Sequence, residues 1–185
     1  MRIFIGVDLP ESLKSDIFQL EQKIQEQSNK GNWKPADSFH ITLRFLGEIE
    51  ETEVKSIAEG LRSEIKGFKP FSLNLKGGGT FDAKGEEQSN IRVLWLGVDG
   101  DLKALNRLYF QTECVLDALC YPRDHREYTP HITLGQSIKL KGGLNTLAPY
   151  FKTLNSSFEV TAVTIFISEV VSGKRSYRPI ERIEF

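Results

Sequence analysis

The chain has 185 residues, of which 39% are hydrophobic and 26% charged, and its formal net charge is −1. This balance is typical of a folded globular domain and excludes a disordered chain. A net charge near zero also excludes a protein that coats nucleic acid through a general basic field, although a local site for a few phosphates stays compatible with it.

Three further features of the composition concern location. No apolar run approaches the ~20 residues that a membrane-spanning helix needs. The opening residues 1–8 are strand-like and too short for a signal peptide. Cys114 and Cys120 are the only cysteines, and a pair without a secretory leader is typical of reduced thiols. We therefore expect a cytoplasmic protein.

The first half of the chain predicts alternating strands and helices. Residues 2–9 are rich in β-branched and aromatic side chains, which indicates a strand. A helix is expected from Pro10 onward, because apolar residues recur there every three or four positions. The next elements are expected in this order: a break at 31–35, a strand at 39–47, a helix at 51–65, a strand at 71–75, a glycine turn or bulge at 77–81 and a polar, mobile loop at 82–90.

The second half continues in the same manner. Residues 91–98 are apolar on both faces, which predicts a central strand. The following elements are expected in this order: a helix from residue 101, an irregular segment at 120–128, a strand from 131, a short helix at 144–151, a long strand at 158–170, a basic turn at 172–176 and a last strand at 177–185. The order is thus β-α-β-α-β followed by β-α-β-α-β-β.

One tetrapeptide, His-Ile-Thr-Leu, occurs twice, at residues 40–43 and 131–134. Each copy lies in a stretch where apolar and polar residues alternate, so each histidine shares a strand face with the threonine two residues later. The two histidines are 91 residues apart, which is about half of the chain. Two copies at this period indicate an internal duplication and not a solenoid repeat.

Two H-x-T rows that face one cleft suit acid–base chemistry on a phosphoryl group. One imidazole can take a proton from a nucleophile while the other gives a proton to the leaving group. The hydroxyls of Thr42 and Thr133 can hydrogen-bond an oxyanion beside each histidine. Arg44 extends the first row with a guanidinium whose shape fits a phosphate.

Other interpretations of these residues find less support. A single strand-face histidine followed by threonine is usually plain surface, but a matched pair is not expected by chance. A zinc site would need three or four ligands, and neither motif has a Cys, Asp or Glu on its own face. His125 lacks the motif and is expected to be a solvated loop residue. A cysteine nucleophile and a serine triad both lack the partners that such sites require.

On these motifs the chain resembles the 2H phosphoesterase superfamily, which is named for its paired H-x-T-x motifs. Within it, the chain is similar to the LigT-like RNA 2′,3′-cyclic phosphodiesterases, also called 2′-5′ RNA ligases. The resemblance covers nearly the whole chain and is carried by residues 2–10, 33–35, 40–47, 77–81, 92–98, 129–134 and 172–177. One departure is that relatives often have a basic residue shortly after the second motif, where this chain has Gly135-Gln136.

The resemblance implies an α+β fold that is bilobal and carries a pseudo-twofold internal duplication. Two antiparallel sheets are expected to face a central cleft, with the helices outside. We expect one domain over residues 1–185, with halves of approximately 1–90 and 91–185.

The resemblance also implies an activity and a set of site residues. The expected reaction hydrolyses a terminal 2′,3′-cyclic phosphate of RNA to a 2′-phosphate with neither a metal nor a nucleotide cofactor. His40 and His131 are then the catalytic pair, and Thr42, Thr133 and Arg44 bind the phosphate. The resemblance favours His40 as the acid toward the ribose oxygen and His131 as the base toward water.

Several expectations about the substrate and its rivals follow. Phe81, Tyr128 and Tyr177 are candidates for the rim of the cleft. Phe81 either stacks on a base or is a plain aromatic residue of the turn. RNA ends or small cyclic nucleotides are the expected substrates of a monomer with no membrane contact and no obligate protein partner. The reverse reaction would join RNA ends through a 2′-5′ bond without ATP. The alternatives are a 2H enzyme for small cyclic nucleotides or 2′-5′ oligonucleotides, and a non-catalytic module that binds RNA ends.

Overall fold

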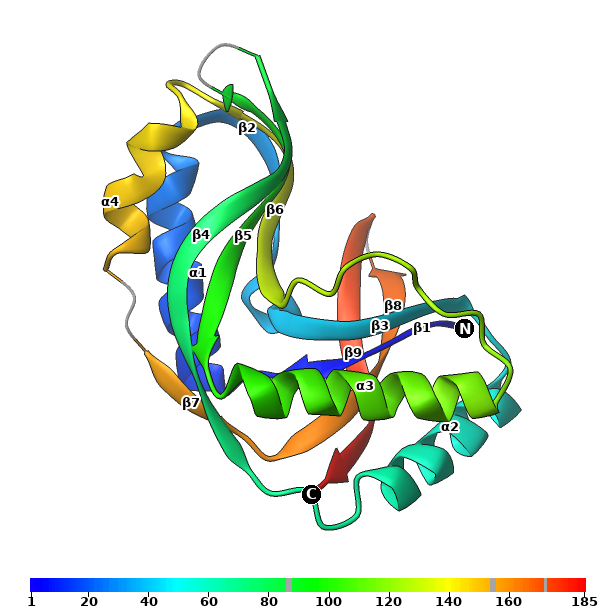
Figure 1. The fold of residues 1–185 in the computed structure, drawn as a ribbon. Helices are drawn as coiled ribbons and strands as arrows, with labels where there is room; N and C mark the ends of the chain where they lie inside the picture. Colours follow the sequence, from blue (N-terminus) through cyan, green and yellow to red (C-terminus); the bar gives the residue numbers. More distant parts are fainter. Residues whose placement is uncertain (86–87, 154–155, 172) are drawn as a thin grey trace.

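The structure is a computed structural model that describes residues 1–85, 88–153, 156–171 and 173–185, and Figure 1 shows its fold. The strands are β1 (Arg2–Asp8), β2 (Ser28–Trp33), β3 (His40–Glu48), β4 (Phe71–Lys84), β5 (Asn90–Gly100), β6 (His131–Leu140), β7 (Ser157–Val160), β8 (Ala162–Val171) and β9 (Lys174–Glu184). The helices are α1 (Glu11–Gln25), α2 (Glu51–Glu64), α3 (Leu102–Ala118) and α4 (Ala148–Phe151), with 3₁₀ turns at Ala36–Ser38 and Leu144–Leu147.

The strands form one curled antiparallel sheet in the order β7-β4-β5-β6-β3-β1-β8-β9, with β2 paired to β6. Strands β3 and β6 join through the pair Ile41↔Ile132 and then diverge, so the sheet consists of two half-sheets. In Figure 1 these half-sheets face one another, and the helices lie on their outer sides. The predicted α+β class with two facing antiparallel sheets is confirmed.

The two half-sheets do not follow the division of the chain near residue 90. One contains β3, β1, β8 and β9, and the other contains β7, β4, β5 and β6 with β2. The helices do not follow the division near residue 90 either. Helix α3, from the second part of the sequence, packs against α2 and β3, whereas α1, from the first part, packs against β2 and the Ala36–Ser38 turn. The first and second parts of the sequence are therefore interleaved, while a single domain over residues 1–185 stays a prediction.

Residues 31–35 were expected to end the first helix, but α1 already ends at Gln25, and strand β2 overlaps the expected break. The sequence of β2 is polar and carries no β-branched residue. It is held by its pairing with β6, from Ser28↔Leu140 to Trp33↔Gly135. Tertiary pairing thus overrides a local sequence that shows no strand propensity.

The expected turn at 77–81 and the first three residues of the expected loop at 82–90 are also part of a strand, since β4 continues to Lys84. A bulge between Leu75 and Gly78 interrupts the register with β5, as the glycines suggested. Glycine is required for packing here, because a Cβ at Gly79 would lie 2.4 Å from the Trp95 ring. Residues 86 and 87 of the expected loop lie outside the described residues.

The long strand expected at 158–170 is divided at Thr161 into β7 and β8. Strand β7 pairs with β4 in one half-sheet, and β8 pairs with β1 in the other. Continuous apolar character does not reveal this break, because both strands face the core. The basic turn expected at 172–176 is shorter than predicted, because β9 already begins at Lys174 and residues 174–176 pair with β8. Residue Ser172 of that turn is outside the described residues.

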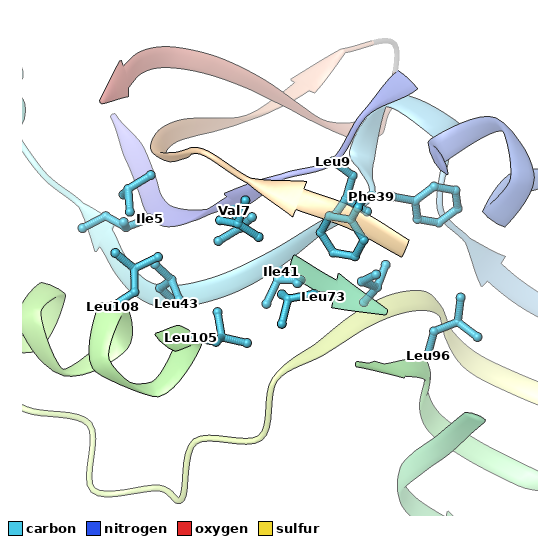
Figure 2. Packing of buried hydrophobic residues seen from close by; sticks show 14 of the residues in the cluster. Ile5, Val7, Leu9, Phe39, Ile41, Leu43, Leu73, Leu96, Leu105 and Leu108 are labelled. Atoms are coloured by element: carbon cyan, nitrogen blue, oxygen red, sulfur yellow. The ribbon is translucent and has the colours of Figure 1, made fainter. Parts of the chain in front are cut away.

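The core fills the space between the curled sheet and the outer helices. Figure 2 shows Ile5, Val7, Leu9, Phe39, Ile41 and Leu43, which come from β1, β3 and the residues next to these strands, with Leu43 close to Leu105 and Leu108 of α3. These side chains are all at most 4% exposed. Burial of each contributes roughly 1.5–3 kcal/mol. The inner face of β3 is thereby fixed, and its opposite face is left for the polar residues of the motif.

No helix of the described residues combines the length and apolarity needed to cross a membrane. The same part of the chain holds no cluster of three or more His, Cys, Asp or Glu side chains arranged for a metal ion. Cys114 and Cys120 are free thiols.

Candidate active site

The pair Ile41↔Ile132 brings the two motifs together at the junction of the half-sheets. Both isoleucines are fully buried, so their neighbours on each strand project from the opposite face of the sheet. Because the pairing is antiparallel, the two motifs run in opposite directions from this pair, and His40 and His131 lie on opposite sides of it. The local twofold relation between the motifs thus follows from a single residue pair.

Each histidine is oriented by the backbone two residues earlier. The Nδ1–H of His40 donates to the Ser38 carbonyl at 2.7 Å, and that of His131 donates to the Thr129 carbonyl, also at 2.7 Å. A carbonyl can only accept, so the neutral rings carry their proton on Nδ1. Nε2 is therefore the nitrogen left to exchange protons in both rings.

The His40 ring lies in an aromatic cage. Phe4 is 4.6 Å away between ring centroids, Phe166 is 5.6 Å away, and Tyr177 meets the ring edge-on at 5.1 Å and 85°. Burial among these rings lowers the pKa of His40 to about 4, with the Lys34 ammonium adding to the effect and Ser38 opposing it. An unoccupied site therefore holds His40 neutral at pH 7.

The His131 ring has a lighter aromatic cover. Phe81 meets it edge-on at 5.0 Å and 84°, and Trp95 lies 6.0 Å away. Burial lowers the pKa of His131, and the hydrogen bond to Thr129 opposes this effect. The Nδ1 bond of His131 lies in a solvent-exposed position, whereas that of His40 is partly buried. The two histidines thus share one orientation but differ in access to water.

The two threonines are both half-buried and line the same cleft. The Thr42 hydroxyl lies 3.0 Å from Nε2 of His40. Its strand can approach β1 closely because Gly6 lies opposite Thr42. A Cβ at Gly6 would lie 2.6 Å from the Ile41 carbonyl oxygen, so a larger residue there would displace β3 at the motif.

Arg44 occupies a different environment from the one its motif position suggests. Its side chain is only 10% exposed, and Nη1 lies 3.5 Å from Glu113 of α3 and 4.0 Å from Asp124. Nη2 donates to the Pro122 carbonyl. The guanidinium lines the cleft with the chain's own carboxylates and a carbonyl beside it, while its Nε and Nη1 make no hydrogen bond in the described structure. Arg44 therefore fastens β3 to α3 and to the segment that precedes the second motif, and its predicted contact with phosphate stays a prediction.

The three rim residues differ in how they meet the cleft. Phe81 and Tyr177 each stand edge-on to one motif histidine and line the cleft, and their contact with a substrate stays a prediction. Tyr128 instead stacks on Tyr109, with ring centroids 4.1 Å apart and planes 1° apart. Its hydroxyl is buried without a hydrogen-bond partner in the described structure, and burial raises the pKa of that hydroxyl.

All of these groups line one cleft of about 400 Å³. Residues that the sequence reasoning did not assign to the site also contribute to it, namely Lys34, Ser38, Arg92, Val93, Tyr109, Asp124, Glu127 and Gln136. Lys34 belongs to the segment Trp33-Lys34-Pro35 shortly before the first motif, and that proximity in sequence is the available signal for it. Arg92 begins the segment 92–98 that carries the resemblance, and Gln136 follows the second motif, but neither fact indicated that these side chains line the cleft. Their position there arises from the pairing of β5 with β6.

Comparison with known proteins agrees with this arrangement. Residues 7–95, which include the first motif, match the family model described as LigT like Phosphoesterase. An RNA 2′,3′-cyclic phosphodiesterase of Thermotoga maritima is 33% identical over 136 residues, or 74% of this chain and 70% of the relative. One of Methanothermobacter thermautotrophicus is 26% identical over 187 residues, or 98% of this chain and 97% of the relative.

Solved structures give the same result over the whole chain. Escherichia coli LigT complexed with 3′-AMP matches with a TM-score of 0.75 and 26% identity, covering 98% of this chain and 95% of that one. A Thermus thermophilus protein, TT0787, has the same fold, with a TM-score of 0.78 and 22% identity over 100% of this chain and 97% of that one. Fold and paired motifs are those of the 2H phosphoesterases. Within that class, the chain belongs to the LigT-like phosphoesterase family.

Proposed function

We propose that this protein hydrolyses the terminal 2′,3′-cyclic phosphate of RNA to a 2′-phosphate. One observation carries the proposal: His40 and His131 line one cleft, and both Nδ1 atoms are bound to backbone carbonyls, which leaves both Nε2 atoms for proton transfer. The name shared by the curated relatives, RNA 2′,3′-cyclic phosphodiesterase, supports the same substrate class.

In the proposed reaction a water oxygen forms a bond to phosphorus while the bond from phosphorus to the ribose O3′ breaks. The water proton passes to Nε2 of one histidine, and Nε2 of the other histidine gives a proton to O3′. The hydroxyls of Thr42 and Thr133 donate to the phosphoryl oxygens, where negative charge increases in the transition state. After the reaction the base histidine is charged and the acid histidine is neutral, so one proton transfer through solvent restores the starting state.

We assign His131 as the base and His40 as the acid. A base that activates water must meet solvent, and His131 has the more open position. The acid must give its proton to the sugar oxygen in preference to solvent, which suits the enclosed His40. A bound phosphate anion favours the charged imidazole and offsets the effect of burial on the pKa of His40. Substrate binding therefore favours the protonated form of His40 that the reaction needs.

A substrate panel tests the proposal. The enzyme would be incubated, with EDTA present, with oligonucleotides ending in a 2′,3′-cyclic phosphate and with 2′,3′-cyclic mononucleotides. Faster turnover of the oligonucleotides, with a 2′-phosphate product, is the expected result. Equal or faster turnover of mononucleotides would instead identify an enzyme for small cyclic nucleotides. Binding of RNA ends with no turnover would identify a non-catalytic module.

Ligation differs from hydrolysis only in the nucleophile, which is an RNA 5′-hydroxyl in place of water, so it needs no further residue. If a 5′-hydroxyl occupies the position of the water, the same pair can form a 2′-5′ bond without ATP. We also propose that the protein acts as a cytoplasmic monomer. One chain supplies both histidines and both threonines, and its two cysteines are free thiols, as in reducing compartments.

A further inference from the structure

Four cationic side chains line the cleft, and they differ in their acidic partners. Arg92 Nε lies 2.5 Å from Asp82, Arg126 Nη2 lies 2.5 Å from Asp124, and Arg44 is paired with Glu113 as described above. Lys34 is the remaining one. No carboxylate of the described residues lies within 4.0 Å of its ammonium group.

Lys34 is held at the junction between the two motifs. Its backbone N–H donates to the Leu134 carbonyl at 3.0 Å, which ties it to the strand of the second motif. Its side chain crosses to the first motif, where Nζ donates to the Tyr177 hydroxyl at 3.2 Å and lies 5.2 Å from that ring centroid. The Tyr177 ring in turn meets His40 edge-on. The ammonium is thus positioned from both half-sheets.

We propose that the Lys34 ammonium, and not the Arg44 guanidinium, supplies the positive charge that contacts a phosphoryl oxygen of the substrate, and that Tyr177 positions it. A phosphate entering between the histidines would meet, at Lys34, a cation that forms no salt bridge with a carboxylate of the described residues. The carboxyl of Glu21 interacts electrostatically with Lys34, but burial raises the pKa of Glu21 to about 8 and keeps that carboxyl mostly protonated at neutral pH. At Arg44 it would have to compete with two carboxylates and a carbonyl. An ammonium acts as a compact point charge, which suits a phosphate whose oxygens shift during the reaction.

The same charge has a second consequence for the chemistry. Lys34 disfavours the protonated form of His40, as does His131, whereas Asp8 favours it. A phosphate that neutralises the Lys34 charge would remove this repulsion when the acid must carry its proton. Lys34 would then couple substrate binding to the protonation of His40. This reasoning rests on the proposed function, but the binding of phosphate itself does not.

Binding of inorganic phosphate to the intact protein tests the proposal without turnover. Histidine ring signals in NMR spectra would report both phosphate affinity and the titration of His40. Lys34→Met should weaken phosphate binding by roughly tenfold or more, as for the loss of a charged hydrogen bond. It should also raise the pKa of His40. Lys34→Arg should retain most of the affinity, and Tyr177→Phe should cause a smaller loss than Lys34→Met.

Lys30→Met is the matched control, because Lys30 is an exposed lysine on the adjacent strand β2 and does not line the cleft. Its phosphate affinity should stay within about twofold of wild type. Thermal melts would establish that each variant is folded. Phosphate affinity of Lys34→Met equal to that of Lys30→Met would overturn the proposal, as would an affinity of Lys34→Arg as low as that of Lys34→Met. Absence of turnover by the wild type would refute the proposed function. The phosphate affinities of the variants would still decide the role of Lys34, because they do not depend on turnover.

Discussion

The hydroxyl oxygen of Thr42 lies 3.0 Å from Nε2 of His40, the ring nitrogen that the backbone leaves free. Because Nδ1 of neutral His40 carries the proton, the hydroxyl donates and Nε2 accepts. No corresponding bond joins Thr133 to His131 in the described part of the chain. The threonine of the first motif is thus engaged with its histidine before substrate arrives, and the two hydroxyls are not equivalent.

We expect Thr42→Ala and Thr133→Ala each to lower kcat by roughly 10-fold to 10³-fold, as for the loss of one donor to a developing oxyanion. Thr42→Ser, which keeps the hydroxyl, should recover most of the rate. Steady-state kinetics on a cyclic-phosphate oligonucleotide would measure these effects. A double Thr→Ala variant with wild-type kinetics would show that neither hydroxyl acts on the phosphoryl group.

The two histidines should behave as one unit. His40→Ala and His131→Ala are each expected to lower kcat by roughly 10²–10⁴-fold, the range for a positioned acid or base. The double variant should be scarcely slower than the slower single variant, because either loss already disables the concerted proton transfer. Single-turnover assays would measure all three. A near-normal rate in one single variant would contradict the two-histidine mechanism.

The dependence of rate on pH should differ between the free enzyme and the substrate complex. Activity requires one charged and one neutral histidine, so a bell is expected. Burial lowers the pKa of both rings in the free enzyme, which places the two limbs of the kcat/KM profile below the ordinary imidazole range. Bound phosphate favours the charged rings and should shift the limbs of kcat to higher pH.

Both profiles can be measured on one oligonucleotide, and their limbs belong to the coupled pair and not to single residues. The basic limb of kcat should lie at higher pH than that of kcat/KM. Coincident basic limbs, or a flat profile, would contradict the proposed effect of the bound anion.

The sequence was sufficient for the parts of the site that depend on local periodicity. Alternation placed His40 and Thr42 on one strand face, and the repeated tetrapeptide predicted a second, related row. The structure has both rows in one cleft, joined at the pair Ile41↔Ile132. That pair could not be derived, because register between strands separated by about 90 residues is set by the packing of the whole sheet.

Long-range partners explain the other differences. Arg44 looked free in its motif, but its acceptors come from α3 and from the segment before the second motif. Strand β2 has no local strand signal and exists through its pairing with β6. The place of Lys34 follows from that pairing, since the strand delivers it to the junction of the motifs. Sequence periodicity carries no information on such contacts.

A buried carboxyl outside the site should make stability depend on pH. Glu21 of α1 is fully buried; Oε1 accepts from Gln25 at 3.0 Å, and Oε2 has no partner in the described structure. Burial raises the pKa of Glu21 to about 8, from an ordinary value of 4.5. Between these values the folded state holds a proton that the unfolded state has released, so stability falls as pH rises from 4.5 to about 8.

Glu21→Gln keeps the shape of the side chain and removes this titration. The variant should melt at a higher temperature than wild type at pH 8, by ~2–4 °C for each kcal/mol by which the substitution increases the free energy of unfolding. It should melt close to wild type near pH 4.5. Thermal unfolding followed by circular dichroism would measure both, with Glu26→Gln as an exposed control on the same segment. Equal pH dependence in the two variants would show that Glu21 is not the titrating group.

The last prediction separates the acid from the base. A leaving group such as an activated aryl alcohol departs without a proton, so a cyclic or diester substrate with that leaving group needs only the base. If the enclosed His40 protonates the leaving oxygen and the more open His131 activates water, the aryl substrate should restore most of the rate lost in His40→Ala. It should leave His131→Ala as slow as with RNA, because water still has to be deprotonated. The measurement is kcat/KM on the two substrates for wild type and both variants, which gives the factor by which the aryl substrate restores the rate of each variant.

The basic limb of the pH profile should also disappear for wild type on the aryl substrate, since no acid is then required. Rescue of His131→Ala alone would reverse the two roles, and equal rescue of both would mean that neither histidine is committed to one side of the phosphorus.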